Sequence, residues 1–143
     1  MRIIKLSKEV SGFENIEACK SYFKYVLPWQ KLRFNIVGDG LHIAQNKLDH
    51  DEIVLFSYDG NCIAVGKVEN LIVEKNKSIA IQLQEKKLKV FESHFPLKEL
   101  EDRLRKVGYV SAVTNTQGWN ILKDKHEEAA LKFIIKKDWE DYL

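Results

Sequence analysis

Two apolar runs joined by a two-residue turn constrain the fold of this chain more than any other feature of its sequence. The first run covers residues 53–58 and the second covers residues 61–68. Between them, Asp59-Gly60 is a dipeptide typical of the type I′ turns that close β-hairpins, because both of its positions tolerate a positive φ angle. The continuous apolar character of the two runs predicts strands buried on both faces. We therefore expect a β-hairpin in the centre of a mostly antiparallel sheet.

Strand and helix patterns outside the hairpin predict an α+β fold without βαβ alternation. Residues 2–6, 32–36, 78–83, 88–91 and 109–113 have the composition of strands. Helical spacing covers residues 11–27, 96–106 and 116–122, and residues 129–135 fit either a helix or a last strand. We expect five or six mostly antiparallel strands in a partly closed barrel or sandwich that is flanked by helices.

Local signals set the expected ends of the helices. Ser11 followed by Glu14 has the spacing of a capping box at a helix N-terminus. Pro28 is expected to end this first helix, because a residue that precedes proline is pushed out of the right-handed helical region. Pro96 suits the first turn of the second helix, and Gly108 suits the position just after its end.

Length and charge fit one domain whose contacts with nucleic acid, if it makes them, are local. The chain has 143 residues, and we expect a single domain over residues 1–143 with a short acidic and aromatic tail at 136–143. The net charge is only +2, from 23 lysines and arginines against 21 acidic residues. Binding of nucleic acid would therefore depend on a local basic patch rather than on bulk charge.

The cysteines and histidines do not have the spacing of a metal site or of a disulfide framework. Cys19 and Cys62 are not in a C-x-x-C motif, and the 4 histidines are scattered. We expect neither a bound metal nor a cofactor. The first residues lack the apolar core of a signal peptide, and no apolar run approaches the roughly 20 residues that cross a bilayer. A cytoplasmic location without membrane contact is the resulting expectation.

Three stretches of the chain resemble EVE domains, in the same order. Residues 44–58 contain A-Q-N-K-L and then D-E-I-V-L-F-S-Y, similar to a family segment in which A-x-N-x-L leads into G-D-x-V-x-F-Y. Residues 63–68 follow as the next strand, and residues 111–122 look like the family's closing segment. The sequence departs from the family at Asp51-Glu52, where G-D is usual, and at Tyr109-Val110, where an arginine often precedes the serine. The resemblance covers about residues 29–122. It implies a PUA-like fold, shared with YTH and ASCH domains and with readers of modification-dependent restriction systems.

Members of this family bind modified bases in DNA or RNA, and the resemblance implies a similar site here. We expect Trp29, Phe34 and Tyr58 to line one concave site, because an extruded base needs stacking faces. The side chains suited to bonding a base edge are Asn35, Asn46, Ser57 and Ser111. The candidate phosphate contacts are Lys31, Arg33, Lys47, Lys86, Lys87 and Arg105. Each of these residues also fits ordinary core packing, turn bonding or a solvated surface.

The sequence predicts a nucleic-acid-binding domain that performs no catalysis. The finer hypothesis is a reader of a methylated base flipped out of DNA, with DNA favoured over RNA, that serves an effector nuclease or motor in a partner chain or a larger parent protein. One alternative is an RNA-binding domain of the ASCH or PUA-like type. Another is a protein-interaction module that docks through a tail containing Trp139 and Tyr142. The last is a metal-dependent nuclease, because Glu85-Lys86-Lys87 formally matches an E-x-K pattern with Asp59 upstream.

Overall fold

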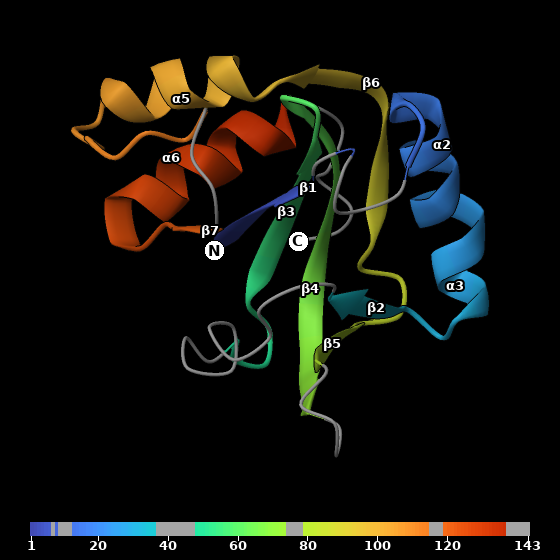
Figure 1. Cartoon of the computed structure of the whole chain (residues 1–143). Coiled ribbons are helices and arrows are strands. Elements are labelled where there is room, and N and C mark those ends of the chain that lie inside the picture. The colour runs from blue at the N-terminus through green and yellow to red at the C-terminus, as the bar shows by residue number, and fades with distance from the viewer. Residues whose placement is uncertain (7, 9–12, 37–47, 74–78, 115–118, 137–143) are drawn as a thin grey trace.

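A computed structural model of the chain shows one mixed sheet with helices on both sides (Figure 1). The structure describes residues 1–6, 8, 13–36, 48–73, 79–114 and 119–136. Its strands are β1 (Arg2–Leu6), β2 (Arg33–Ile36), β3 (Ile53–Tyr58), β4 (Asn61–Val73), β5 (Ile79–Leu83), β6 (Lys89–Pro96) and β7 (Trp119–Ile121). Its helices are α2 (Ile16–Ser21), the π-helical turn η1 (Tyr22–Val26), α3 (Leu27–Trp29), α5 (Leu97–Arg105) and α6 (Asp124–Ile135). The strand order is β2-β5-β4-β3-β1-β7, with β6 also paired to β4.

The predicted hairpin is confirmed as the centre of this sheet. β3 pairs antiparallel with β4, from Ile53 opposite Lys67 up to the Asp59-Gly60 turn. The two turn residues have φ angles of 49° and 78°, and two successive positive values are what a type I′ turn requires. Every residue of β3 is buried, as its continuous apolar run predicts. β1 pairs parallel to β3, and the other strand pairs of the described residues are antiparallel.

Apolar side chains form a core on each face of the sheet. On one face, α5 and α6 pack in a cluster that includes Phe91 and Phe95. On the other face, α2, η1 and α3 pack in a cluster that includes Phe23, Phe34 and Phe56. The two helical groups therefore lie on opposite sides of the sheet (Figure 1). The α+β class is as predicted, and the end strands β2 and β7 do not pair with each other among the described residues. Within that part of the chain, no helix has the length and apolar character needed to cross a membrane.

The first helix begins later than predicted and continues past the proline. Asn15 caps it by accepting the Ala18 N–H at 2.8 Å, whereas Ser11 lies outside the described residues. The prediction that Pro28 ends the helix is wrong, because Leu27 keeps helical angles of φ −59° and ψ −44° and Pro28 lies in the first turn of α3. The π turn η1 changes the hydrogen-bond register just before the proline. The buried Leu27 side chain ties this turn to the core.

Residues 109–113 form an irregular segment, so the strand predicted there is wrong. The buried Glu101 carboxylate on α5 accepts the backbone N–H groups of Val113 and Thr114, each at 2.8 Å. Arg105 donates from Nη1 to two carbonyl groups of the segment, at 2.8 and 3.2 Å. Side chains therefore satisfy backbone groups that a strand would pair with a neighbouring strand.

One further element differs from its prediction, and one open choice is decided. Trp119–Ile121 is the strand β7 rather than part of a helix, because it pairs antiparallel with β1. Residues 129–135 belong to helix α6. β5 and β6 do not form a hairpin with each other, since both pair with β4, β6 along its first half and β5 along its second half. The connection between β5 and β6 therefore runs along one edge of β4.

Candidate nucleic-acid-binding groove

A groove of about 940 Å³ lies between the end of the first helical segment and the β5–β6 connection. We call it the lysine groove, because its charged lining residues are Lys24, Lys31, Lys86, Lys89 and Glu85. Its other lining residues are Phe23, Pro28, Leu32, Gln82, Leu88 and Val90. The volume is in the range of sites that hold small organic ligands. The groove therefore combines an apolar surface with an excess of cations.

Aromatic packing beneath the helical segment fixes one wall of the lysine groove. Phe23 is fully buried, and its ring centroid lies 4.7 Å from that of Phe56 and 5.7 Å from that of Phe34. Leu27, one helical turn later, is buried as well. Because Phe23 and Leu27 face the core, Lys24 is left exposed at the groove. Buried apolar anchors thus set the place of a charged side chain.

The turn between α3 and β2 adds a second cation beside the helix. Lys31 and Leu32 have φ angles of 55° and 60°, a conformation that non-glycine residues rarely adopt. The Leu32 N–H donates to the Leu27 carbonyl, and the Leu83 N–H donates to the Leu32 carbonyl, both at 2.9 Å. Gln82 donates from Nε2 to the Lys31 carbonyl at 2.5 Å. These bonds offset a backbone conformation that costs about 1–3 kcal/mol per residue.

The opposite wall is the β5–β6 connection, which side chains hold against β4. The Gln84 N–H donates to the Lys67 carbonyl at 2.9 Å, and the Gln84 Nε2 donates to the Asp51 carboxylate at 2.6 Å. The bond from Gln84 lowers the pKa of the Asp51 carboxyl, and the charge of His50 adds to this effect. Lys86, at a φ angle of 61°, follows in the same turn and lines the groove. The tether therefore fixes the base of a cationic wall.

The three predicted stacking residues do not lie together in one site. Trp29 follows the lining residue Pro28 and is 90% exposed, whereas Phe34 is 6% exposed and Tyr58 is fully buried. Phe34 packs against other rings of the core, and Tyr58 donates its hydroxyl to the Phe13 carbonyl at 2.7 Å. Phe34 and Tyr58 thus stabilise the core, and Trp29 remains exposed beside the lysine groove.

The predicted phosphate contacts are divided between the lysine groove and other surfaces. Lys31 and Lys86 line the groove. Arg33 on β2 and Lys87 in the β5–β6 connection are half-buried. Arg105 lies on α5, across the sheet, where its guanidinium bonds carbonyl groups of the loop that follows. Its charge is therefore engaged within the fold. Outside the described residues lie Lys47 and the predicted base contact Asn46.

The other predicted base contacts are not gathered at the groove, which contains a different polar residue. Asn35 is exposed on β2, Ser57 is buried within β3, and Ser111 is exposed in the loop after α5. The polar lining residue is Gln82, which interrupts the otherwise apolar strand β5. Sequence reasoning missed Gln82 and Lys24. The polar residue within an apolar strand is the sequence feature that could have indicated Gln82. No sequence feature distinguishes Lys24 from an ordinary solvated residue of a helix.

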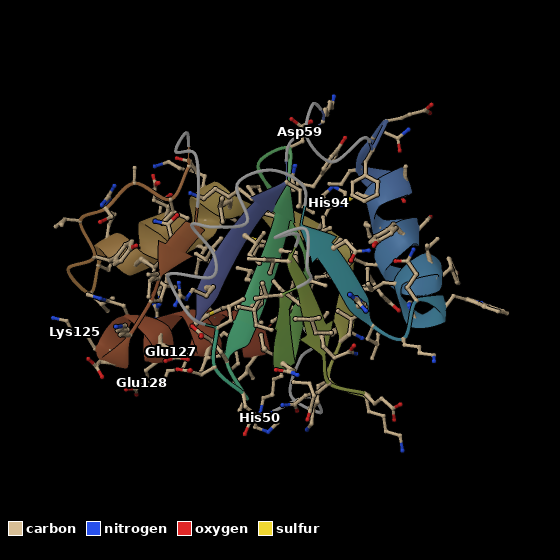
Figure 2. All side chains as sticks on the ribbon, turned by 60° about the horizontal axis from the view of Figure 1, so that its bottom comes forward. His50, Asp59, His94, Lys125, Glu127 and Glu128 are labelled. Atoms are coloured by element: carbon tan, nitrogen blue, oxygen red, sulfur yellow. The ribbon has the colours of Figure 1, made fainter. Side chains whose placement is uncertain are left out.

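The carboxylates of the nuclease alternative do not come together. Glu85 is exposed in the β5–β6 connection, which is bonded to the middle of β4. Asp59 lies in the turn before β4 and pairs with Lys8 at 3.5 Å. About six strand residues separate these two levels, roughly 20 Å at 3.3 Å per residue. Asp59 and His50, which flanks the tether of that connection, are at opposite ends of the sheet in Figure 2. No group of three or more histidine, cysteine or acidic side chains placed to hold a metal occurs among the described residues.

Comparison with solved structures shows which fold this is. The crystal structure of ASCH from Zymomonas mobilis matches this chain with a TM-score of 0.53 at 10% sequence identity, over 92% of this chain and 93% of that chain. Neither a family model nor a curated protein matches the sequence. The fold is therefore ASCH-like, within the PUA-like class that the sequence predicts. At this identity the likeness concerns the fold alone.

Proposed function

We propose that this domain binds nucleic acid in the lysine groove and performs no chemistry on it. One observation carries the proposal: Lys24, Lys31, Lys86 and Lys89 line a single groove in a chain whose net charge is only +2. The groove therefore has a local excess of positive charge in a chain whose total charge nearly balances. Glu85 is the acidic residue among the lining residues, so cations remain in excess.

The lysines lie on both walls of the groove, where a nucleic-acid backbone can run between them. Lys24 and Lys31 belong to the helical side, and Lys86 and Lys89 belong to the β5–β6 side. Each lysine that neutralises a phosphate releases a condensed counterion, so the affinity of such a site falls as salt rises. Ammonium groups on flexible stems suit this role, because they act as point charges that adapt to phosphate spacing.

Trp29 supplies a stacking surface next to these cations. It follows Pro28 at the end of α3, and its side chain is 90% exposed. Stacking of a base on an aromatic side chain contributes about 1–3 kcal/mol and tolerates any base sequence. The exposed position of so large an aromatic residue beside a cationic groove supports a role in binding rather than in folding.

The finer proposal concerns the kind of ligand and its biological setting. In it the bound base carries a modification such as a methyl group, the nucleic acid is DNA rather than RNA, and the cytoplasmic domain selects sites for a nuclease or motor subunit. Trp29 supports the base-stacking part. The modification, the preference for DNA and the restriction setting rest on the sequence resemblance alone. The neighbouring coding regions and a panel of modified oligonucleotides test them directly.

The test of nucleic-acid binding uses labelled DNA and RNA oligonucleotides, methylated and unmethylated, in fluorescence anisotropy at two salt concentrations. We expect binding at low salt that weakens at high salt. Neutralising two groove lysines in Lys31→Gln/Lys86→Gln should lower the salt slope by about two and weaken every ligand alike. The matched control is Lys125→Gln/Lys132→Gln on α6, where both side chains are exposed outside the lysine groove. Figure 2 shows Lys125 at the end of the molecule away from α2 and α3. Equal losses in both variants, or no binding at low salt, would overturn the proposal.

The absence of catalysis is tested with the same oligonucleotides. They are incubated with the protein and Mg²⁺ or Mn²⁺, and we expect them to remain intact. Metal-dependent cleavage that disappears in Glu85→Gln would replace this part of the proposal with the nuclease alternative.

A protein-interaction surface is the second candidate function. Trp29, Tyr25 and Val26 are 90%, 63% and 44% exposed on the same helical segment. Exposed apolar side chains that gather on one surface are typical of protein contacts. This candidate takes first place if the domain binds none of the oligonucleotides at low salt.

A further inference from the structure

We infer that Gln82 reads the base edge in the lysine groove, so that the groove takes an unpaired base that donates an N–H group. This inference rests on the proposed function and names the class of ligand: a single strand rather than a duplex. It is carried by the hydrogen bonds of the Gln82 amide, which leave its oxygen, and not its nitrogen, for a ligand.

The orientation of the Gln82 amide is fixed by two carbonyl groups. Nε2 donates to the Lys31 carbonyl at 2.5 Å and to the Leu83 carbonyl at 3.3 Å. A side-chain amide has two N–H donors, and both partners here are acceptors only. The reverse orientation would set the amide oxygen against two carbonyl oxygens. Both donors of Gln82 are thus engaged with the backbone, and Oε1 is the group that remains.

This oxygen is accessible and has no partner among the described residues. Gln82 is half-buried and lines the lysine groove. The fully buried side-chain polar atoms without a partner in that part of the chain are Asn120 Oδ1 and His126 Nε2. Oε1 of Gln82 is not one of them, so solvent reaches it. The groove therefore presents a fixed, accessible hydrogen-bond acceptor on β5.

An acceptor at this place needs a donor from the ligand, and phosphate oxygens cannot supply one. Phosphates bond the lysines, which are donors only. The donors of a nucleic acid are base N–H groups and, in RNA, the ribose 2′-hydroxyl. The apolar lining by Leu32, Leu88 and Val90 suits the face of a base. In a duplex the base faces are stacked, and the N–H donors that remain are exocyclic amino groups at the groove edges. An acceptor beside an apolar surface that suits a base face therefore points to an unpaired base.

The experiment compares single-stranded oligonucleotides that differ in one methyl group on the wild-type protein. One set contains uridine, a second contains N3-methyluridine, which lacks the N–H donor, and a third contains 5-methyluridine, which adds the same bulk but keeps the donor. We expect N3-methylation to weaken binding about threefold to tenfold, the range of one hydrogen bond. We expect 5-methylation to have little effect, and the matching duplexes to bind more weakly than the single strands.

A protein variant then assigns the effect to Gln82. Gln82→Met keeps the length of the side chain without its polar atoms, and we expect it to bind uridine and N3-methyluridine equally. Because Gln82→Met also loses the bond to the Lys31 carbonyl, its salt slope is measured as well. A slope equal to that of the wild type shows that Lys31 keeps its contribution to binding. Gln30→Met is the matched control, because Gln30 is exposed and does not line the lysine groove. Far-ultraviolet circular dichroism checks that both variants are folded.

Each outcome decides between the two proposals. Equal binding of the uridine and N3-methyluridine strands by the wild type would overturn the role of Gln82 while nucleic-acid binding stands. Duplexes that bind as tightly as single strands would overturn the unpaired base in the same way. Discrimination that persists in Gln82→Met would move the acceptor to another residue. Failure to bind any oligonucleotide at low salt would instead overturn the proposed function itself.

Discussion

The two faces of the sheet use polar side chains in different ways. On the α5–α6 face, Glu101, Arg105 and Asn120 bond backbone groups of the loop at residues 109–114. On the α2–α3 face, the backbone of Lys31 and Leu32 is held by strand β5, and the lysine side chains extend to the groove. Glu101 and Arg105 are thus engaged in folding on one face, whereas Lys24, Lys31 and Lys86 are exposed at the groove on the other.

Because of this difference, we expect polar residues on the α5–α6 face to affect stability and lysines of the groove to affect binding. A polar group removed from the α5–α6 face leaves buried backbone donors or acceptors without partners, which lowers the free energy of unfolding. Removing Lys24, Lys31 or Lys86 from the lysine groove should leave the fold intact, because these side chains are exposed. Variants on the α5–α6 face should therefore change the free energy of unfolding, and variants in the lysine groove should change the affinity for nucleic acid.

The largest expected effect is on the α5–α6 face, at Glu101. The Glu101→Ala variant leaves the N–H groups of Val113 and Thr114 without their acceptor. We expect it to lower the free energy of unfolding by about 2–3 kcal/mol, measured by urea denaturation. Asp102→Ala is the control, because Asp102 is exposed on the same helix and pairs only with a surface lysine in the described structure. A loss of the same size in both variants would remove the distinction between engaged and exposed charge.

The same residue predicts a pH dependence. The N–H of Thr114, with added bonds from Val113 and the Thr114 hydroxyl, lowers the pKa of the Glu101 carboxyl from 4.5 to about 2. Because the folded pKa lies below the unfolded one, the ionised carboxylate stabilises the fold fully above pH 4.5 and loses this effect as the pH falls toward 2. Urea midpoints measured across that window should fall more steeply for the wild type than for Glu101→Gln. Parallel curves would contradict the assignment.

On the groove face, Trp29→Ala should change binding and not stability. The Trp29 side chain is 90% exposed, so we expect the free energy of unfolding to change by no more than about 0.5 kcal/mol. Loss of stacking should weaken single-strand binding by about 1–3 kcal/mol, measured by fluorescence anisotropy. Tyr25→Ala is the companion variant, because Tyr25 is the exposed aromatic residue one helical turn earlier on the same segment. An equal loss of affinity in both variants would show that the stacking is not specific to Trp29. Wild-type affinity in Trp29→Ala would show that the base does not stack there.

Sequence patterns predicted the elements whose causes are local. The hairpin around Asp59-Gly60 depends on two neighbouring apolar runs and on a dipeptide that adopts positive φ angles. All of these features lie within residues 53–68. The strand predicted at residues 109–113 failed because its backbone partners are carboxylate and guanidinium groups of α5. The apolar pattern of residues 109–113 does not indicate that side chains of α5 bond their backbone. The helix continued past Pro28 because the π turn and the buried Leu27 overrode a local preference.

The candidate site was less predictable than the fold, because three distant segments build it. Lys24, Lys31 and Lys86 come together only when the α3–β2 turn packs against β5. The sequence alone predicts Lys31 and Lys86 as phosphate contacts, but it does not predict that they line the same groove. The aromatic residues were placed wrongly for a different reason. Phe34 and Tyr58 are residue types that suit a stacking pocket, yet a strand residue that faces the core and one that faces a ligand have the same sequence pattern. Burial distinguishes them, and burial is a property of the folded chain.

The smallest expected effect is at Gln84, whose side chain tethers the β5–β6 connection. In Gln84→Met, the bonds from Nε2 to the Asp51 carboxylate and to the Val68 carbonyl are lost, while the Gln84 N–H can still donate to the Lys67 carbonyl. We expect a loss of stability well below that of Glu101→Ala and a fall in affinity smaller than that of Trp29→Ala. Asp51→Asn is the companion variant, because asparagine keeps an acceptor and tolerates the φ angle of 69° at this position. If the tether matters through its hydrogen bond, Asp51→Asn should change affinity less than Gln84→Met. If Gln84→Met instead destabilised the fold as much as Glu101→Ala, the groove face would also depend on engaged polar groups, and the division between the two faces would fail.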